Sequence, residues 1–276
     1  MVSRESGQSA RNPRVSGAMM RYYRARARSS SEDAAITALA HANLVFNAPM
    51  SDTRAAELVA SAHPLAHARV ADLGCGWAEL LLRMLAAEGT ATGVGIDTDA
   101  GAIERGLAAA AARGLRDRVR LEVADIAAMT SGPADVVLCI GASYAWAGVR
   151  PALQAIRPLL RPGGRLLFGE PYWERPPGPR ALAALGAVAG DLGSLADLTD
   201  LAVACGYGIM AVATASTGEW DAYESGWCGG LERWLLHHPC TPQADRVRAA
   251  ADRHRQGWLN GRRGKLGFAY LTLSVP

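Results

Sequence analysis

The chain has 276 residues, half of them hydrophobic, so it is long enough to bury a core without a disulfide framework. Its five cysteines are odd in number and include no C-x-x-C pair, which predicts reduced thiols, a cytoplasmic protein and no metal site. No stretch reaches the roughly 18 apolar residues of a membrane span.

The net charge of +3 is unevenly distributed along the chain. Residues 1–30 hold seven arginines against Glu5 alone, a charge of +6, which leaves −3 for the rest. A mildly acidic body argues against a basic face for nucleic acid. A transit peptide is the less favoured interpretation of the arginine-rich start, because it has no apolar signal core.

The first 17 residues, rich in Ser, Gly, Arg and Asn, are typical of a disordered tail. We expect one domain over 18–276, whose first part, 18–67, is helical. Capping-box pairs at Ser29/Glu32 and Ser30/Asp33 predict a helix through 34–40, and a second helix is expected over about 52–61, before Pro64.

Strands and helices then alternate. Strands are expected at 69–73, 92–96, 119–123, 135–140 and 165–169, with helices at 77–87, 100–113 and 150–160. This βα repeat predicts an α/β, Rossmann-like parallel sheet with helices on both faces.

The pattern changes in the C-terminal half, 173–276. Helices are expected at 181–204, 222–238 and 242–258, and strands at 207–215 and 266–275. The two strands fit an antiparallel hairpin that completes a seven-stranded sheet. The helical insertion between them, about 217–260, is too long for an ordinary loop and is expected to form a lid.

The most informative motif is Val70-Ala-Asp-Leu-Gly-Cys-Gly76, a strand that breaks into a glycine loop. A dinucleotide-binding G-x-G-x-x-G loop has a third small residue where this chain has Glu79. A carboxylate there would repel a pyrophosphate at the helix N-terminus. The loop is therefore expected to bind a ligand without phosphates, which disfavours an NAD-dependent oxidoreductase.

The segment Asp72-Leu-Gly-Cys-Gly76 resembles motif I of the class I S-adenosylmethionine (SAM) dependent methyltransferases, whose cofactor carries no phosphate. The resemblance implies that Gly74, Cys75 and Gly76 let the backbone approach the methionine tail of SAM and that Asp72 holds its amino group. Ala78 replaces a glycine often found in the family, and alanine is expected to exclude a left-handed backbone there.

The resemblance extends through residues 68–172, the expected SAM-binding core. It implies that Asp97, with Thr98, binds the ribose hydroxyls, that Asp125 and Ile126 bind the adenine, and that Ile140 lies beside the cofactor. Structural roles are the alternative, since Asp72, Asp97 and Asp125 each suit the cap of a following turn or helix.

Two segments after strands are candidates for catalysis and acceptor binding. Cys139–Trp146 supplies Tyr144 and Trp146; in a similar bacterial subset a histidine often replaces Tyr144, and tyrosine is a weaker base, with a pKa of about 10. This segment lacks the Asn/Asp-Pro-Pro-Tyr pattern of nucleic-acid amino-methyltransferases.

The second segment follows strand 165–169. Glu170 is the candidate base or amine ligand, Pro171 is expected to turn the chain, and Tyr172 and Trp173 are expected to wall the pocket. Pairing of Glu170 with an arginine, and core positions for the two aromatic residues, are the structural alternatives.

Helical residues outside the core supply further candidates. His41 is the histidine expected to contact substrate from the lid. Tyr223, Trp227 and Trp234 share one helical face, a pattern more typical of core than of pocket.

These features predict a SAM-dependent methyltransferase acting on a small-molecule O, N or C nucleophile, in secondary metabolism. A protein that binds SAM for a different reaction is the alternative. No feature indicates an oligomeric state.

Overall fold

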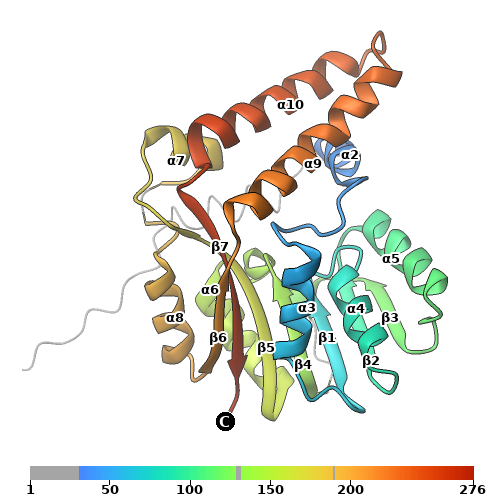
Figure 1. Cartoon of the computed structure of the whole chain (residues 1–276), viewed down its shortest axis with the longest axis vertical. Coiled ribbons are helices and arrows are strands. Elements are labelled where there is room, and N and C mark those ends of the chain that lie inside the picture. Colours follow the sequence, from blue (N-terminus) through green and yellow to red (C-terminus); the bar gives the residue numbers. More distant parts are fainter. Residues whose placement is uncertain (1–30, 129–131, 189) are drawn as a thin grey trace, which may run out of the picture.

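The computed structural model describes residues 31–128, 132–188 and 190–276 (Figure 1). The tail expected over 1–17 and the start of both capping-box pairs lie outside these residues. Seven strands form one sheet in the order β3-β2-β1-β4-β5-β7-β6, and β7 runs in the opposite direction to the other six. This confirms the predicted Rossmann-like sheet with a closing antiparallel strand. The strands are β1 (Arg69–Leu73), β2 (Thr92–Asp97), β3 (Val119–Val123), β4 (Ala134–Ile140), β5 (Leu160–Trp173), β6 (Gly208–Thr214) and β7 (Leu266–Ser274).

Helices cover both faces of the sheet because its central strands are apolar on both sides. On β4, Val136 and Leu138 point into one core and Val137 and Cys139 into the other. The first core contains α3 (Asp52–Ser61), α4 (Glu79–Ala87) and α5 (Ala100–Ala112), and the second contains α6 (Val149–Ile156) and α8 (Leu195–Ala204).

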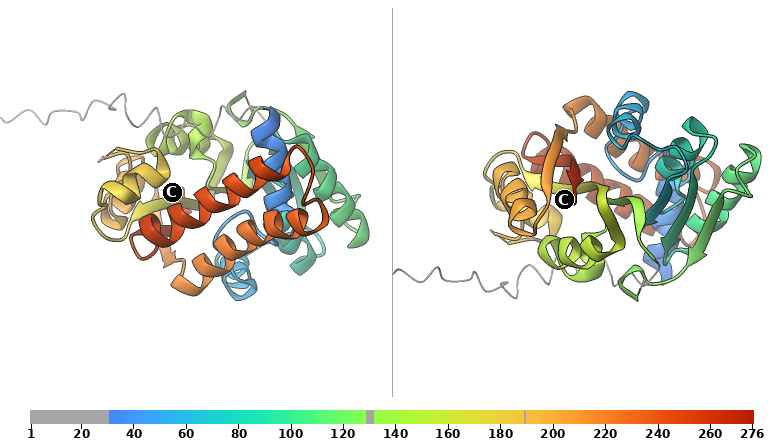
Figure 2. Two further views of the ribbon diagram at one scale, coloured as in Figure 1. Left: turned by 90° about the horizontal axis from the view of Figure 1, so that it is seen from above. Right: turned by 90° about the horizontal axis from the view of Figure 1, so that it is seen from below.

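Three further helices lie across one end of the sheet (Figure 1; Figure 2, left). They are α2 (Ser31–His41), α9 (Thr217–His237) and α10 (Ala244–Gly257), which runs into a π-helical turn, η4 (Trp258–Arg262). They share a separate apolar core that includes Ala40, Leu231 and Val247. We call α2, α9, α10 and η4 the lid.

Gly230 lets α9 approach α2 closely, because a Cβ there would lie 2.6 Å from the Leu39 carbonyl oxygen. The start of α9 is fixed by a capping box between Ser216 and Glu219, and Glu219 also accepts a hydrogen bond from Ser51 Oγ (2.8 Å). The lid is thus joined to the segment that precedes α3.

Several strands and helices begin or end at residues other than those expected from the sequence. Strand β5 extends four residues beyond Gly169 because it pairs with β7, a partner about 100 residues later in the chain, so Pro171 lies within the strand and makes no turn. The helix expected over 181–204 is two helices, α7 (Pro179–Leu185) and α8; Gly186, with φ +61°, ends the first. The helix expected over 150–160 ends at Ile156 and continues as a 3-10 turn, η3 (Arg157–Leu159).

The backbone at Ala78 contradicts the sequence-based expectation. This residue adopts the left-handed conformation (φ 58°, ψ 25°), and α4 begins after it, at Glu79, rather than at Trp77. A left-handed alanine costs roughly 1–2 kcal/mol.

Replacing Ala78 by glycine is expected to leave the free energy of unfolding within about 0.5 kcal/mol of that of the parent, because relief of the left-handed backbone is offset by the entropy cost of glycine and by loss of a methyl group buried in the core. Urea unfolding measures the change. In the matched variant Ala108→Gly, inside α5, the same substitution is expected to cost about 1 kcal/mol. A loss of stability in Ala78→Gly similar to that in Ala108→Gly would contradict the prediction.

In the described part of the chain, no helix combines the length and apolarity needed to cross a bilayer. The same residues contain no cluster of three or more His, Cys, Asp or Glu side chains suited to a metal ion, and the five cysteines are free thiols.

Candidate active site

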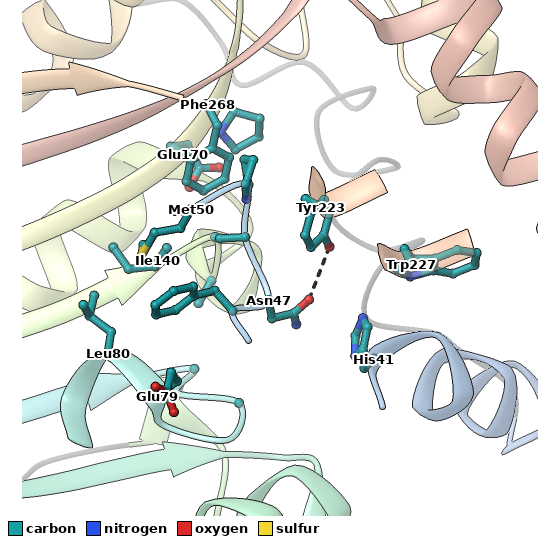
Figure 3. Close-up of a pocket in the computed structure, with 18 of the residues that line it drawn as sticks. His41, Asn47, Met50, Glu79, Leu80, Ile140, Glu170, Tyr223, Trp227 and Phe268 are labelled. Atoms are coloured by element: carbon teal, nitrogen blue, oxygen red, sulfur yellow. Dashed lines mark hydrogen bonds between the residues drawn. The ribbon is translucent and has the colours of Figure 1, made fainter. Parts of the chain in front are cut away.

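A cavity of about 480 Å³ lies between the lid and the carboxyl ends of β1, β2, β4 and β5 (Figure 3). We call it the inner cavity. Parallel sheets bind ligands at this edge, and the volume is in the range of about 300–1,000 Å³ typical of small-molecule sites. Its lining from the sheet edge includes Asp72, Gly74, Cys75, Gly76, Asp97, Ile140, Tyr144 and Glu170, and its lining from the lid and nearby segments includes His41, Trp220, Tyr223 and Trp227.

The loop after β1 is held against the end of β2. The amides of Gly74 and Cys75 both donate to the Ile96 carbonyl (2.9 and 3.0 Å), and the Gly76 amide donates to Asp97 Oδ2 (2.8 Å). Gly74 has a φ of +74°, and a Cβ there would lie 2.5 Å from Ala142 Cβ. Glycine is therefore required at position 74 by both conformation and space.

The loop also brings two carboxyl groups, those of Asp72 and Asp97, together without a counter-charge in the part of the chain that the structure describes. Burial, and next the charge of Asp97, raise the pKa of Asp72 to about 8. Burial and the same two carboxylates raise the pKa of the Cys75 thiol well above its usual value. Neither carboxylate has an ion-pair partner among the described residues. This environment favours a cationic ligand and disfavours phosphate.

Glu79 does not supply the negative charge that the sequence predicts would repel a phosphate. Its carboxylate forms ion pairs with Arg83 (2.8 Å) and Arg113 (2.7 Å), so it is neutralised within the protein. The negative charge that would repel a phosphate comes instead from Asp97, and from Asp72 when it is ionised.

Three other residues expected to hold the cofactor lie outside the inner cavity. Thr98, Asp125 and Ile126 are absent from the lining of the inner cavity. Asp125 accepts a hydrogen bond from the Ala127 amide (2.9 Å) at a 3-10 turn, η1 (Ile126–Ala128), as the structural alternative expected. Asp99, rather than Asp97, caps α5. The expected roles of Thr98, Asp125 and Ile126 stay predictions.

The two candidate catalytic side chains both line the inner cavity. Glu170 lies on β5 and is 2 % exposed, and its Oε1 accepts a hydrogen bond from Ser143 Oγ (2.8 Å). Tyr144 follows Ser143 in the 3-10 turn η2 (Ser143–Trp146) after β4. Sequence reasoning missed Ser143, although it lies in the segment that supplied Tyr144.

Three aromatic residues that were candidates for acceptor binding, Trp146, Tyr172 and Trp173, do not line the inner cavity. Tyr172 and Trp173 continue β5 and are buried in the two cores, because β5 stays paired with β7 beyond Glu170. The Tyr172 hydroxyl donates to Glu174. Trp146 packs against the core on the α6 side. The structural alternative holds for Tyr172 and Trp173.

The aromatic wall comes instead from α9. Tyr223 and Trp227 pack against the first core and the lid core, as expected, but they also line the inner cavity. Trp234 packs against the lid core, stacks on His238 and does not line the cavity. The Tyr223 hydroxyl donates to Asn47 Oδ1 (3.3 Å; Figure 3). His41 also lines the cavity, with its ring edge-on to Trp77 (5.7 Å).

A buried polar network in the lid was not predicted. Glu224 is 3 % exposed and contacts Arg262 Nη2 through both oxygens (3.2 Å each) and His254 Nε2 (2.5 Å). The His254 ring stacks on Trp227 (3.7 Å between centroids). These residues come from α9, α10 and η4, so no local spacing in the sequence indicates their contact.

The lid is tied directly to the loop after β1. Arg105 of α5 donates to the carbonyls of His41 (2.9 Å) and Leu44 (2.5 Å), and its guanidinium lies 4.1 Å from the Trp77 ring. Trp77 Nε1 in turn donates to the Val45 carbonyl (2.7 Å). The segment after α2 is therefore positioned by the same loop that lines the floor of the cavity.

Comparisons with known proteins agree with this geometry. A family model described as a methyltransferase domain matches residues 71–166. The chain is 31% identical over 184 residues to YjhP of Escherichia coli (strain K12), covering 66% of this chain and 74% of that protein. It is similar to the crystal structure of a SAM-dependent methyltransferase from Thiobacillus denitrificans in complex with S-adenosylhomocysteine, with 29% identity, a TM-score of 0.81, and coverage of 87% of this chain and 98% of that one. A SAM-dependent methyltransferase from Geobacter sulfurreducens, also in complex with S-adenosylhomocysteine, gives 26% identity, a TM-score of 0.82, and coverage of 88% and 98%.

Proposed function

Because this chain belongs to the class I SAM-dependent methyltransferases, we propose that it transfers the SAM methyl group to a small molecule bound in the inner cavity. One observation carries the proposal: the loop after β1 and the aromatic residues of the lid line the same cavity. A donor held by the loop and an acceptor held by the lid would then meet there.

The residues of the loop after β1 have the space and the charge that binding of SAM requires. The glycine backbone leaves open space, since a Cβ on Gly76 would meet nothing within 4 Å, and Asp72 and Asp97 supply negative charge for a ligand with an ammonium and a sulfonium group. When bound, SAM supplies an activated methyl group with its own leaving group. We assign Asp72, Gly74, Gly76 and Asp97 to this ligand.

The contribution of the protein is then mainly positioning. Holding an acceptor in line with the methyl group supplies much of the rate, and the lid aromatics exclude water from the cavity. Glu170 is placed to accept a proton from an acceptor hydroxyl or protonated amine, and Ser143 orients its carboxylate. We further propose a cytoplasmic location and a role in secondary metabolism, without a nucleic-acid partner.

The experiment that tests the function is detection of S-adenosylhomocysteine by mass spectrometry after incubation with SAM and a panel of phenols, amines and carboxylic acids. Production above the acceptor-free control, with a methylated acceptor of matching mass, is the expected result. Binding of S-adenosylhomocysteine without turnover on any acceptor would favour a different reaction of SAM, and absence of binding would overturn the cofactor assignment.

Replacing Glu170 by glutamine is expected to lower kcat by about 10²-fold or more, since general-base catalysis contributes about 10²–10⁴-fold. Ser143→Ala is the control, because it removes the hydrogen bond and keeps the carboxylate, and its loss is expected to be smaller. A kcat in Glu170→Gln like that of the parent would exclude Glu170 as the base.

A further inference from the structure

A second cavity, of about 940 Å³, adjoins the inner cavity on the lid side. The two share Thr37, Trp227, His254 and Arg262 in their linings. We call the second one the outer chamber. It is bounded by α2, α7, α9, α10 and η4, and the indole of Trp227 and the imidazole of His254, stacked on one another, lie where the two spaces meet.

The lining of the outer chamber is cationic. It contains Arg180, Arg253 and Arg262, together with the amide side chains of Gln256 and Asn260, and its described lining contains no Asp or Glu. Residues 31–276 have a net charge of −3, so this concentration of guanidinium groups is local.

Two of the three arginines are available to a ligand. Arg262 is engaged by the buried Glu224, but Arg180 and Arg253 have no ion-pair partner among the described residues. By contrast, the neighbouring Arg255 and Arg263 are paired, with Asp252 and Asp221. Of these four neighbouring arginines, the two without an ion pair in the described part of the chain, Arg180 and Arg253, are the two that line the chamber.

The backbone brings these arginines together from distant elements. A Cβ on Gly261 would lie 3.0 Å from the Arg180 carbonyl oxygen and 2.9 Å from Ala184 Cβ, so the absence of a side chain in η4 lets α7 pack against it. The same π-helical turn ends with Arg262 beside Glu224. Single-turn π-helical insertions often occur at functional sites.

We infer that the outer chamber binds the acid group, a carboxylate or a phosphate, of the methyl acceptor. The rest of the acceptor would pass Trp227 into the inner cavity, where its planar or apolar part contacts Tyr223 and Trp220. Guanidinium groups bind both anions through paired, charge-assisted hydrogen bonds. This assignment of substrate class rests on the proposed methyl transfer.

The test measures binding of three probes of similar size to the protein loaded with S-adenosylhomocysteine: benzoate, phenyl phosphate and benzyl alcohol. Calorimetry is expected to show binding of one or both anions and much weaker binding of the neutral alcohol. The preferred anion then distinguishes a carboxylate acceptor from a phosphate acceptor.

The double variant Arg180→Gln, Arg253→Gln is expected to weaken binding of the preferred anion by about tenfold or more, as for lost hydrogen bonds between charged groups. Arg248→Gln, an exposed change on α10 outside the chamber lining, is the matched control and is expected to leave it unchanged. Quenching of tryptophan fluorescence by the probe should disappear in Trp227→Phe.

Equal binding of the alcohol and the anions, or unchanged anion affinity in the double variant, would overturn the inference. The affinity for S-adenosylhomocysteine, measured in the same samples, separates this result from failure of the proposed function. If the protein still binds S-adenosylhomocysteine, only the acceptor class is wrong. If the parent protein does not bind it, the cofactor assignment is wrong.

Discussion

Replacing Asp72 by asparagine is expected to weaken SAM binding by about 10- to 100-fold and, at the same time, to raise the melting temperature of the unliganded protein at pH 8. The first effect is loss of a buried anion that faces a cationic ligand. The second follows because burial and Asp97 make the ionised Asp72 unfavourable in the absence of ligand. Calorimetry with SAM and thermal unfolding measure the two effects.

Asp99→Asn is the matched control for Asp72→Asn. It removes one negative charge nearby, at the exposed N-cap of α5, where asparagine caps a helix as well as aspartate. Both SAM affinity and melting temperature are expected to stay close to those of the parent. If Asp72→Asn and Asp99→Asn changed SAM affinity and melting temperature equally, the burial of Asp72 would not explain either effect.

The raised pKa of Asp72 also predicts the pH dependence. The folded protein retains a proton up to about pH 8, whereas the unfolded chain releases it near 3.8, so this group makes stability fall as pH rises from about 4 to 8. A cationic ligand favours the ionised form, so SAM affinity should rise over the same range, with proton release on binding at pH 7. Titrations in buffers of different ionisation enthalpy detect this proton, which should vanish in Asp72→Asn.

Replacing Gly74 by alanine is expected to cost about 2–4 kcal/mol of unfolding free energy and to abolish SAM binding. Its φ of +74° strains any residue with a side chain, and the added Cβ would lie 2.5 Å from Ala142 Cβ, so the loop must move away from the turn after β4. Urea unfolding gives the stability, and calorimetry gives the binding.

Gly76→Ala separates strain from steric conflict. Gly76 also has a positive φ (+53°), but an added Cβ meets nothing within 4 Å, so only the backbone cost of about 1–2 kcal/mol is expected. Equal losses of stability in the two variants would show that contact with Ala142 does not hold the loop.

Hydrogen bonds join the lid to the loop after β1. Trp77 and Arg105 connect the loop after β1 and α5 to the segment between α2 and α3, and Ser51 connects that segment to the start of α9.

The sequence alone determined the sheet, the glycine loop and the presence of a helical lid, because each depends on local signals. Apolar runs define β1 to β4, glycines mark the turn after β1, and the spacing of apolar residues indicates α9 and α10. Asp72, Asp97, Tyr144 and Glu170 were located in the same way, as polar residues at the ends of parallel strands, where the fold directs them to one edge.

Tertiary structure decided which aromatic residues face the cavity and how charge is distributed around it. Pairing with β7 carries Tyr172 and Trp173 into the cores, while packing of α2 and α10 leaves Tyr223 and Trp227 facing the inner cavity. Arg83 and Arg113 neutralise Glu79, and Glu224 meets His254 and Arg262. These contacts join residues that are far apart in the chain, and their geometry depends on how whole elements pack, which local sequence patterns do not encode.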